Sequence, residues 1–182
     1  VFWLITPDNP NEININGLAS GTKEFTIGGY PDQLTNPITN KLTKQIGTVE
    51  TSGDKKTAFE GGRVLNRMEI KPLDGQTDTQ LINSLGGAYN GVDLKGVNYN
   101  FYGNREGFYN ANSNNFAYTV GVNAGVKDQM DAFKPNPTAI IGGVAPGYGT
   151  TLPTTSVFKQ LQASLANIER EVKNLLTNLK NK

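Results

Sequence analysis

The polar segment Y-N-A-N-S-N-N-F, from Tyr109 to Phe116, holds the densest group of chemically useful side chains in the sequence. It directly precedes a stretch whose apolar residues recur with helical spacing. Backbone N–H groups at a helix start lack partners and carry partial positive charge, so they can stabilise the oxyanion formed at a serine placed there. Ser113 is therefore the candidate nucleophile, with Asn112 and Asn114 as neighbouring candidate catalytic residues. The same residue types are preferred helix N-caps, so the segment also fits a plain cap.

The composition limits the chemistry that Ser113 could perform. The 182 residues include no cysteine and no histidine, so the chain holds no thiol nucleophile, no imidazole base and no complete Ser-His-Asp triad. The usual zinc ligands are missing too, and we expect neither a metal nor a cofactor. Any chemistry would use Ser, Thr, Tyr, Lys, Asp or Glu, or a residue outside the chain. Because the numbering opens at Val1, inside an apolar run, we expect a fragment or a processed product.

Paired carboxylates are a second source of chemistry without histidine, because two acids at a fixed separation can cleave glycosides. Asp128 and Asp131 are three residues apart, and Asp74, Asp93 and Glu106 are isolated in expected loops. We interpret these acids as solvated surface side chains. The glycine pairs do not predict a phosphate loop, since none stands between a strand and a helix start of the G-K-S or G-K-T type.

Charge and hydropathy exclude two further classes of function. The 17 basic and 16 acidic side chains give a net charge of +1, which argues against electrostatic capture of nucleic acid. No apolar run approaches the roughly 18 residues that a membrane span requires. We therefore favour no nucleic-acid partner and no membrane span. The length fits one globular domain over residues 1–150, followed by a linker and an amphipathic helix over 151–182.

Short apolar runs predict the strands of the domain. V-F-W-L-I at 1–5 is a continuous apolar run that ends in a Pro/Asn-rich turn, which is typical of a buried central strand. Residues 24–27 and 63–71 alternate like half-buried strands, and 97–101 alternates over a shorter range. Residues 30–62 have only scattered apolar positions, so we expect long loops with one short helix there.

Two helices are predicted before residue 130. Thr77 and Gln80 are three residues apart and can form a reciprocal capping box, while the glycine pair at 86–87 should end that helix. A second helix is expected to begin near Ser113 and to end near Gly125. Ser113 would then lie in the first turn of this helix.

The C-terminal segment 156–182 differs from the rest of the chain. Its apolar residues recur at alternating spacings of three and four: Phe158, Leu161, Leu165, Ile168, Val172, Leu175 and Leu179. This is the a/d pattern of a helix that packs along a narrow seam. The segment carries a net charge of +3, against −2 for residues 1–155. The partner surface could be a second copy, another protein or the domain itself.

Four pieces of the sequence resemble bacterial polymorphic toxins. Y-N-A-N-S-N-N-F-A-Y-T-V-G-V-N-A-G-V is similar to a Y-N-S-N-S segment, followed by Phe or Tyr and by a helix ending in A-G, found near the end of many of these toxins. V-F-W-L-I-T-P-D-N-P looks like their opening strand, T-D-T-Q-L-I-N-S-L like the helix before the motif, and P-G-Y-G-T-T-L-P like their closing loop. The resemblance covers residues 1–153 and includes the contact-dependent inhibition, filamentous-haemagglutinin and Rhs types. It implies a secreted effector domain, delivered into a target bacterial cell and recognised by a cognate immunity protein.

A more distant resemblance concerns permuted papain-like hydrolases, including lecithin:retinol-acyltransferase-like families. In these, a strand carrying a histidine comes first, and an N-C-polar-polar-F segment opens a later helix. Asn112-Ser113-Asn114-Asn115-Phe116 fits that segment with serine in place of cysteine, and the expected histidine would stand just before Val1, outside the chain. The resemblance implies an α+β fold with a permuted papain-like core, a small antiparallel sheet packed on helices and long loops. It also implies that the Ser113 hydroxyl faces a cleft lined by the 1–5 strand.

Three functional hypotheses follow. The first is a secreted toxin-effector domain that acts as a hydrolase or acyl-transfer enzyme through Ser113 and a histidine missing from the fragment. The second is a non-enzymatic binding or delivery module that grips a partner through its Asn-rich loops and C-terminal helix. The third is a nuclease or another toxin chemistry on the same domain.

Overall fold

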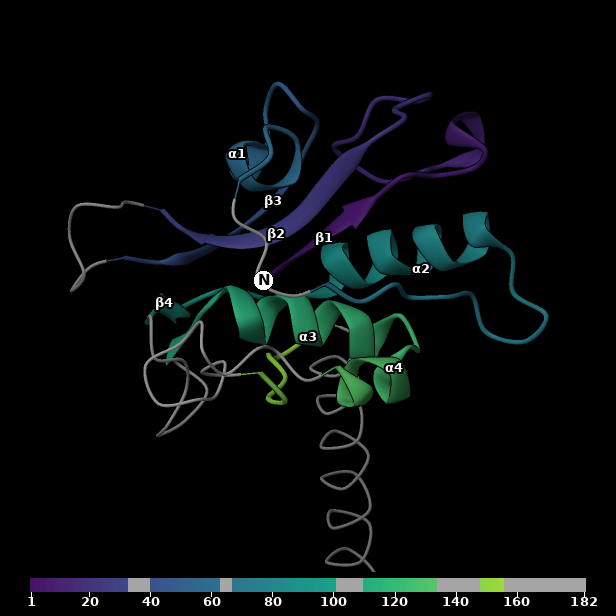
Figure 1. Ribbon diagram of the computed structural model, residues 1–182. Helices are drawn as coiled ribbons and strands as arrows, with labels where there is room; N and C mark the ends of the chain where they lie inside the picture. Colours follow the sequence, from purple (N-terminus) through teal and green to yellow (C-terminus); the bar gives the residue numbers. More distant parts are fainter. Residues whose placement is uncertain (33–39, 63–66, 101–109, 134–147, 156–182) are drawn as a thin grey trace, which may run out of the picture.

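The computed structural model describes residues 1–32, 40–62, 67–100, 110–133 and 148–155. These residues form a mixed α+β fold in which a small antiparallel sheet packs on helices (Figure 1). The strands are β1 (Phe2–Ile5), β2 (Phe25–Pro31), β3 (Leu42–Gly47), β4 (Asn98–Tyr99) and β5 (Asn110–Ala111). The helices are the 3-10 helix η1 (Pro10–Glu12) and the α-helices α1 (Lys55–Ala58), α2 (Asp78–Gly91), α3 (Ser113–Asn123) and α4 (Lys127–Ala132).

The main sheet has the strand order β1-β2-β3, with antiparallel pairing throughout. The predicted strand at 1–5 is confirmed, but the expectation that it is central is wrong. Within the described sheet β1 pairs with β2 alone, and β2 holds the central place. A continuous apolar run suggests burial of both strand faces, whereas Leu4 is 48% exposed.

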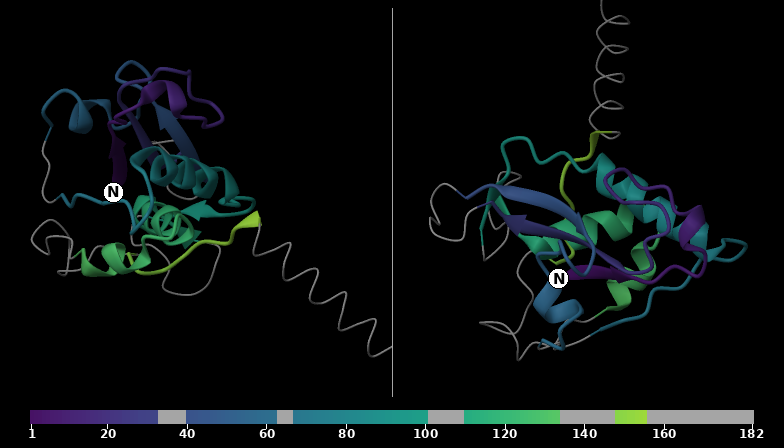
Figure 2. Two further views of the ribbon diagram at one scale, coloured as in Figure 1. Left: turned by 90° about the vertical axis from the view of Figure 1, so that its right-hand side faces the viewer. Right: turned by 90° about the horizontal axis from the view of Figure 1, so that it is seen from above.

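The two faces of β2 have different partners. Phe25 and Ile27 are fully buried in the core on the side of the sheet that α2 and α3 cover. Figure 2 shows these two helices on one side of the sheet. Gly29 lies on the same side, where a β-carbon would come within 2.7 Å of Phe116 on α3. Thr26 and Tyr30 point to the opposite side, toward the turn that precedes α1. The central strand therefore contacts both the α3 region and the segment before α1.

The capping box of α2 is confirmed. The Gln80 N–H donates to Thr77 Oγ1 at 3.2 Å, and the Thr77 N–H donates to Gln80 Oε1 at 2.9 Å. The predicted end at residues 86–87 is wrong, because the helix continues to Gly91. Gly86 is a packing position, since a β-carbon there would lie 2.4 Å from Ile15 Cγ1.

Lys44 of β3 binds the C-terminal end of α2. Its ammonium group donates to the carbonyl oxygens of Tyr89, Asn90 and Val92 at 3.0, 2.9 and 3.1 Å. A cation at this end satisfies unpaired carbonyls and opposes the negative end of the helix dipole. A residue of a distant strand thus caps the C-terminal carbonyls of this helix.

The helix predicted to begin near Ser113 is confirmed as α3. The Trp3 indole N–H donates to the Ala117 carbonyl at 3.0 Å and ties β1 to this helix. Thr119 Oγ1 accepts the Leu152 N–H at 2.7 Å, so the segment 148–155 also packs against α3. Leu152 is buried in the core, and Thr154 bridges to Val92.

Other expectations for the middle of the chain need correction. Residues 67–71 form no strand, and 63–66 lie outside the described residues. The segment 30–62 contains the expected short helix, α1, but also β3, which the sequence reading took for loop. The short strand in 97–101 is confirmed as β4, which pairs in parallel with β5. The helical seam in 156–182 lies outside the described residues.

Candidate functional site

Asn112 and Ser113 have different structural roles at the start of α3. Asn112 is the N-cap, and its Oδ1 accepts the N–H groups of Asn114 at 2.8 Å and Asn115 at 3.3 Å. The Asn112 N–H donates to Asn115 Oδ1 at 3.1 Å, which completes a capping box. Ser113 is the first helical residue, so its hydroxyl is not the helix cap.

This arrangement changes the expected electrostatics of the helix start. The N–H groups of Asn114 and Asn115 are paired with Asn112, so they are not open to an oxyanion. Asn112 is only 2% exposed, which keeps its side chain away from a bound substrate. Of the three candidate residues, the structure brings Ser113 and Asn114 to the chain's first residue and gives Asn112 a structural task.

The main-chain nitrogen of Val1 lies beside Ser113. It is 3.3 Å from Ser113 Oγ and 3.4 Å from Asn114 Oδ1. Although Val1 is 42% exposed overall, burial of its amino group lowers the pKa of that group, and the Asp54 carboxylate acts in the opposite direction. The beginning of β1 therefore contacts the start of α3.

Tyr99 on β4 belongs to a third element near the start of α3. Burial raises the pKa of Tyr99, and the Ser113 side chain acts in the opposite direction. The backbone of Tyr99 is held because its N–H donates to the Asn40 carbonyl at 2.8 Å and because it pairs with Ala111 on β5.

A fourth group lies on the other side of the sheet. The Tyr30 phenol donates a hydrogen bond to Asp54 Oδ2. Burial raises the pKa of Asp54, while Tyr30 and the Val1 amino group lower it. Burial and the same carboxylate raise the pKa of Tyr30. Gly28 makes room for the pair, since a β-carbon there would come within 2.6 Å of the Tyr30 hydroxyl.

Ser52 fixes the turn that carries Asp54. Its hydroxyl is 2.6 Å from Thr26 Oγ1 on β2 and accepts the Asp54 N–H at 3.0 Å. The Val1 amino group is thus the link between the Ser113 hydroxyl and the half-buried Asp54 carboxylate, which acts on it from the other side of the sheet. The sequence alone did not indicate Asp54 or Tyr30 as site residues, and it included Tyr99 only as part of the strand predicted at 97–101. The sole local signal was the alternation of Thr26, Gly28 and Tyr30, which points one face of β2 toward this turn.

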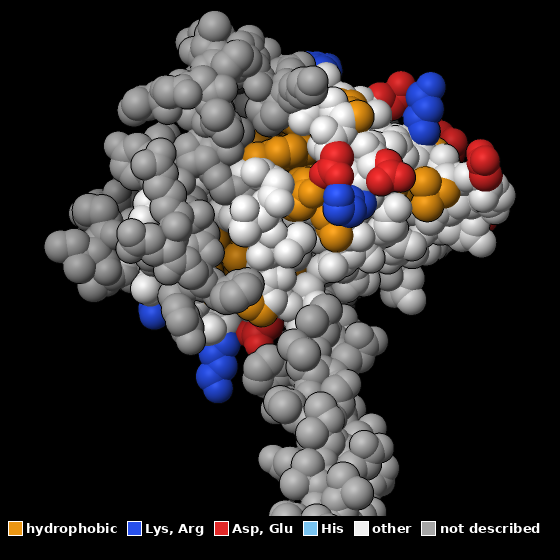
Figure 3. All heavy atoms as spheres, turned by 90° about the horizontal axis from the view of Figure 1, so that it is seen from below, with side chains coloured by type: hydrophobic (Ala, Val, Ile, Leu, Met, Phe, Trp, Pro, Cys, Tyr) orange, Lys and Arg blue, Asp and Glu red, His pale blue; other side chains and the backbone are white. Residues whose placement is uncertain are grey.

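The acids considered as alternatives do not form a site. Asp131 on α4 accepts the Tyr118 hydroxyl at 2.5 Å and pairs with Lys127, and its side chain is 43% exposed. These partners lower the pKa of Asp131. Asp128 lies on the same helix, Asp74 and Asp93 lie in loops, and Glu106 is outside the described residues. Figure 3 shows the molecule from below. On the described part of that face, acidic and basic side chains lie next to one another.

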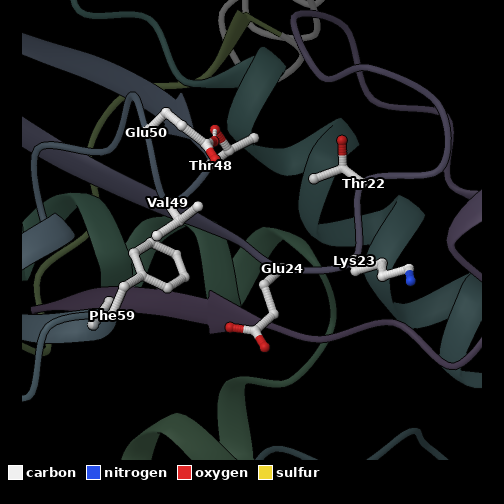
Figure 4. Close-up of a pocket in the computed structure, with 8 residues that line it drawn as sticks. Thr22, Lys23, Glu24, Thr48, Val49, Glu50 and Phe59 are labelled. Carbon is white, nitrogen blue, oxygen red and sulfur yellow. Dashed lines mark hydrogen bonds between the residues drawn. The ribbon is translucent and has the colours of Figure 1, made fainter.

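A hollow of about 580 Å³ lies at the other end of β2 from Tyr30. Its walls come from the segment before β2, from the turn after β3 and from the C-terminal end of α1 (Figure 4). The lining residues are Thr22, Lys23, Glu24, Thr48, Val49, Glu50, Ala58 and Phe59. Ser113 does not line this hollow. The cleft expected in front of Ser113 therefore stays a prediction.

The described parts of the chain contain no cluster of three or more His, Cys, Asp or Glu residues that could hold a metal ion. They also contain no helix with the length and apolar character needed to cross a membrane. Comparison with models of known protein families, with curated proteins and with solved structures finds no match for this chain.

Proposed function

We propose that this domain is a bacterial toxin effector that acts as a hydrolase or acyl-transfer enzyme, with Ser113 as nucleophile and a histidine immediately before Val1 as base. The observation that carries the proposal is the 3.3 Å separation between the Val1 nitrogen and Ser113 Oγ. A residue before Val1 would be bonded to this nitrogen, so its side chain would begin close to the serine hydroxyl. A general base must be within hydrogen-bond reach of the proton that it removes.

In this reaction the imidazole takes the proton of Ser113 while Oγ attacks the carbonyl carbon of an ester or amide. A bond forms between Oγ and that carbon, and the leaving group departs with the proton from the imidazolium. Water or a second acceptor then attacks the acyl-serine and releases the acyl group. A serine needs such a base because its hydroxyl is a weak nucleophile at its ordinary pKa.

We propose Asp54 as the group that orients this base. Its carboxylate acts on the charged Val1 amino group when Val1 is the first residue. With a residue bonded before Val1 that nitrogen is an uncharged amide, and the proposed partner of Asp54 is the imidazole itself. The carboxylate would accept the second N–H of the imidazole and stabilise the imidazolium that forms during attack. The secreted effector would meet its cognate immunity protein in the producing cell.

The test uses the chain extended upstream by its natural residues and produced inside a bacterium. We expect growth arrest, which Ser113→Ala should abolish without lowering the melting temperature of the purified protein. Ser84→Ala is the matched control, because Ser84 is a helix serine that donates to the Gln80 carbonyl at 2.8 Å, away from this site. Growth arrest that persists in Ser113→Ala would contradict the role of Ser113 as nucleophile. A residue other than histidine before Val1 in the natural sequence would contradict the proposed base.

The hollow favours a second candidate function, a non-enzymatic binding module. Val49 is 40% exposed there and stands with Phe59 among charged side chains, which suits a protein partner with an apolar anchor. In this case Val49→Asp and Phe59→Ala would abolish growth arrest or partner binding, and Ser113→Ala would leave both unchanged. The two candidates thus give opposite results in the same assay.

A further inference from the structure

We propose that Asn16 is a site of spontaneous covalent modification, at which the side-chain amide is lost as ammonia and an aspartate linked through its side chain is formed. The sequence contains two Asn-Gly pairs, Asn16–Gly17 and Asn90–Gly91. Glycine has no β-carbon that would hinder attack of its main-chain nitrogen on the preceding side chain. The two pairs have different backbone surroundings, and these surroundings decide which pair reacts.

Asn16 and Gly17 form the middle of an exposed turn. The Leu18 N–H donates to the Ile15 carbonyl at 3.1 Å, and Gly17 has a φ of 89°. Glycine is the residue that a type II turn favours at this third position. Asn16 and Gly17 are both exposed. Neither the Asn16 side chain nor the Gly17 N–H has a hydrogen-bond partner among the described residues, so the two reacting groups are free to approach each other.

The reaction needs water as its only other reactant. The Gly17 main-chain nitrogen loses its proton and attacks Cγ, the carbonyl carbon of the Asn16 side chain. A bond forms between this nitrogen and Cγ, and the side-chain nitrogen takes up the proton and leaves as ammonia. Water then opens the cyclic imide at one of its two carbonyl carbons. The product is either an ordinary aspartate or an aspartate whose side chain carries the main chain.

The second Asn-Gly pair is held by helix α2. Asn90 and Gly91 are the last two residues of this helix, and the Lys44 ammonium group donates to the Asn90 carbonyl at 2.9 Å. A helix fixes ψ near about −42° and pairs each interior N–H with a carbonyl four residues earlier. Ring closure at Asn90 therefore requires opening of the last helical turn. An exposed turn opens at a lower cost in free energy, so we expect modification at Asn16.

Modification at Asn16 should disturb the packing of Ile15. Ile15 is only 4% exposed and lies against Gly86 of α2, where a β-carbon would come within 2.4 Å of Ile15 Cγ1. The side-chain-linked product adds one carbon to the main chain at the next residue, together with one negative charge. We expect this longer main chain to displace Ile15 from α2 and to lower the melting temperature of the modified protein.

The experiment incubates the purified 182-residue chain at mildly alkaline pH, both folded and in urea, and follows the two pairs by peptide mass spectrometry. Fragment ions locate the residue at which an OH group has replaced NH2. In the folded chain we expect Asn16 to react at least about tenfold faster than Asn90, the ratio given by a difference of about 1.4 kcal/mol in opening free energy. In urea the two rates should converge, because both pairs are then equally free to close the ring.

Asn16→Gln is the matched variant, because its longer side chain closes the ring with difficulty. Its melting temperature should stay constant during the incubation, while that of the unsubstituted chain falls. Equal rates at Asn16 and Asn90 in the folded chain would overturn the inference, and so would an Asn16 that reacts only in urea. An equal fall in melting temperature in Asn16→Gln would contradict the effect of this modification on Ile15.

Discussion

Ser113 and Asn112 are neighbours whose contributions to stability and activity should differ. Asn112 caps two N–H groups and is almost fully buried, whereas the Ser113 hydroxyl accepts a hydrogen bond from the Val1 nitrogen. We expect Asn112→Ala to lower the free energy of unfolding by about 1–2 kcal/mol, the usual range for losing such a cap. Ser113→Ala should lower it by less than about 0.5 kcal/mol, the usual effect of a substitution away from such features. Urea denaturation of both variants is the measurement, and a larger loss in Ser113→Ala would contradict this division.

The raised pKa of Asp54 implies that the free energy of unfolding decreases as the pH rises through that pKa. Burial raises its folded-state pKa, so the folded protein keeps a proton that the unfolded chain loses above its ordinary pKa of about 3.9. Its contribution to stability is therefore greatest at acid pH and falls as the pH rises through the raised pKa. Asp54→Asn cannot ionise, so its melting temperature relative to the unsubstituted protein should increase between pH 3.5 and pH 7.

Asp131 provides a control of opposite sign for that measurement. Lys127 and Tyr118 lower its folded-state pKa, so its contribution is lost as the pH falls through that pKa. The melting temperature of Asp131→Asn relative to the unsubstituted protein should therefore decrease between pH 3.5 and pH 7. Parallel trends in the two variants would contradict the assignment of Asp54 as the desolvated acid.

At the scale of the element, α2 contains a pair of adjacent glycines with opposite requirements. Gly86 faces Ile15, which leaves no space for a β-carbon, whereas a β-carbon at Gly87 would meet nothing within 4 Å. We expect Gly86→Ala to lower the free energy of unfolding by about 1–3 kcal/mol, as overpacking does. Gly87→Ala should raise it by about 0.5–1 kcal/mol, because alanine is favoured over glycine inside a helix. Thermal or urea unfolding compares the two, and a gain in both variants would show that Ile15 yields easily.

At the scale of the whole molecule, the segment 156–182 raises the question of self-association. Its seven-residue seam is apolar at spacings typical of helix pairing, and its net charge is opposite in sign to that of residues 1–155. Leu152 and Thr154 are buried, so a cut after residue 155 leaves the described core intact. We expect light scattering to give a dimer or higher oligomer for residues 1–182 and a monomer for residues 1–155. Two monomers of equal stability would exclude the seam as an interface.

The start of α3 and the cap of α2 could be predicted from the sequence, because their signals are local. Thr77 and Gln80, like Asn112 and Asn115, are three residues apart, and their reciprocal hydrogen bonds depend on little beyond the first helical turn. The first strand was also predictable, because a run of five apolar residues has few stable alternatives. Its edge position was not, since Leu4 looks the same in a central and an edge strand.

Only the tertiary structure decided what surrounds Ser113. The Val1 nitrogen is 112 residues from Ser113 in sequence, and it arrives there because β1 pairs with β2 and Trp3 binds α3. Asp54 joins the group because Thr26 holds the turn before α1 against the far face of β2 through Ser52. The alternation along β2 indicates that Thr26 and Tyr30 share a face, but no pattern within one strand says which distant segment packs on that face. The helix start that carries Ser113 was therefore set by the sequence near it, while the neighbours of Ser113 were set by strand pairing and by burial of both faces of the central strand.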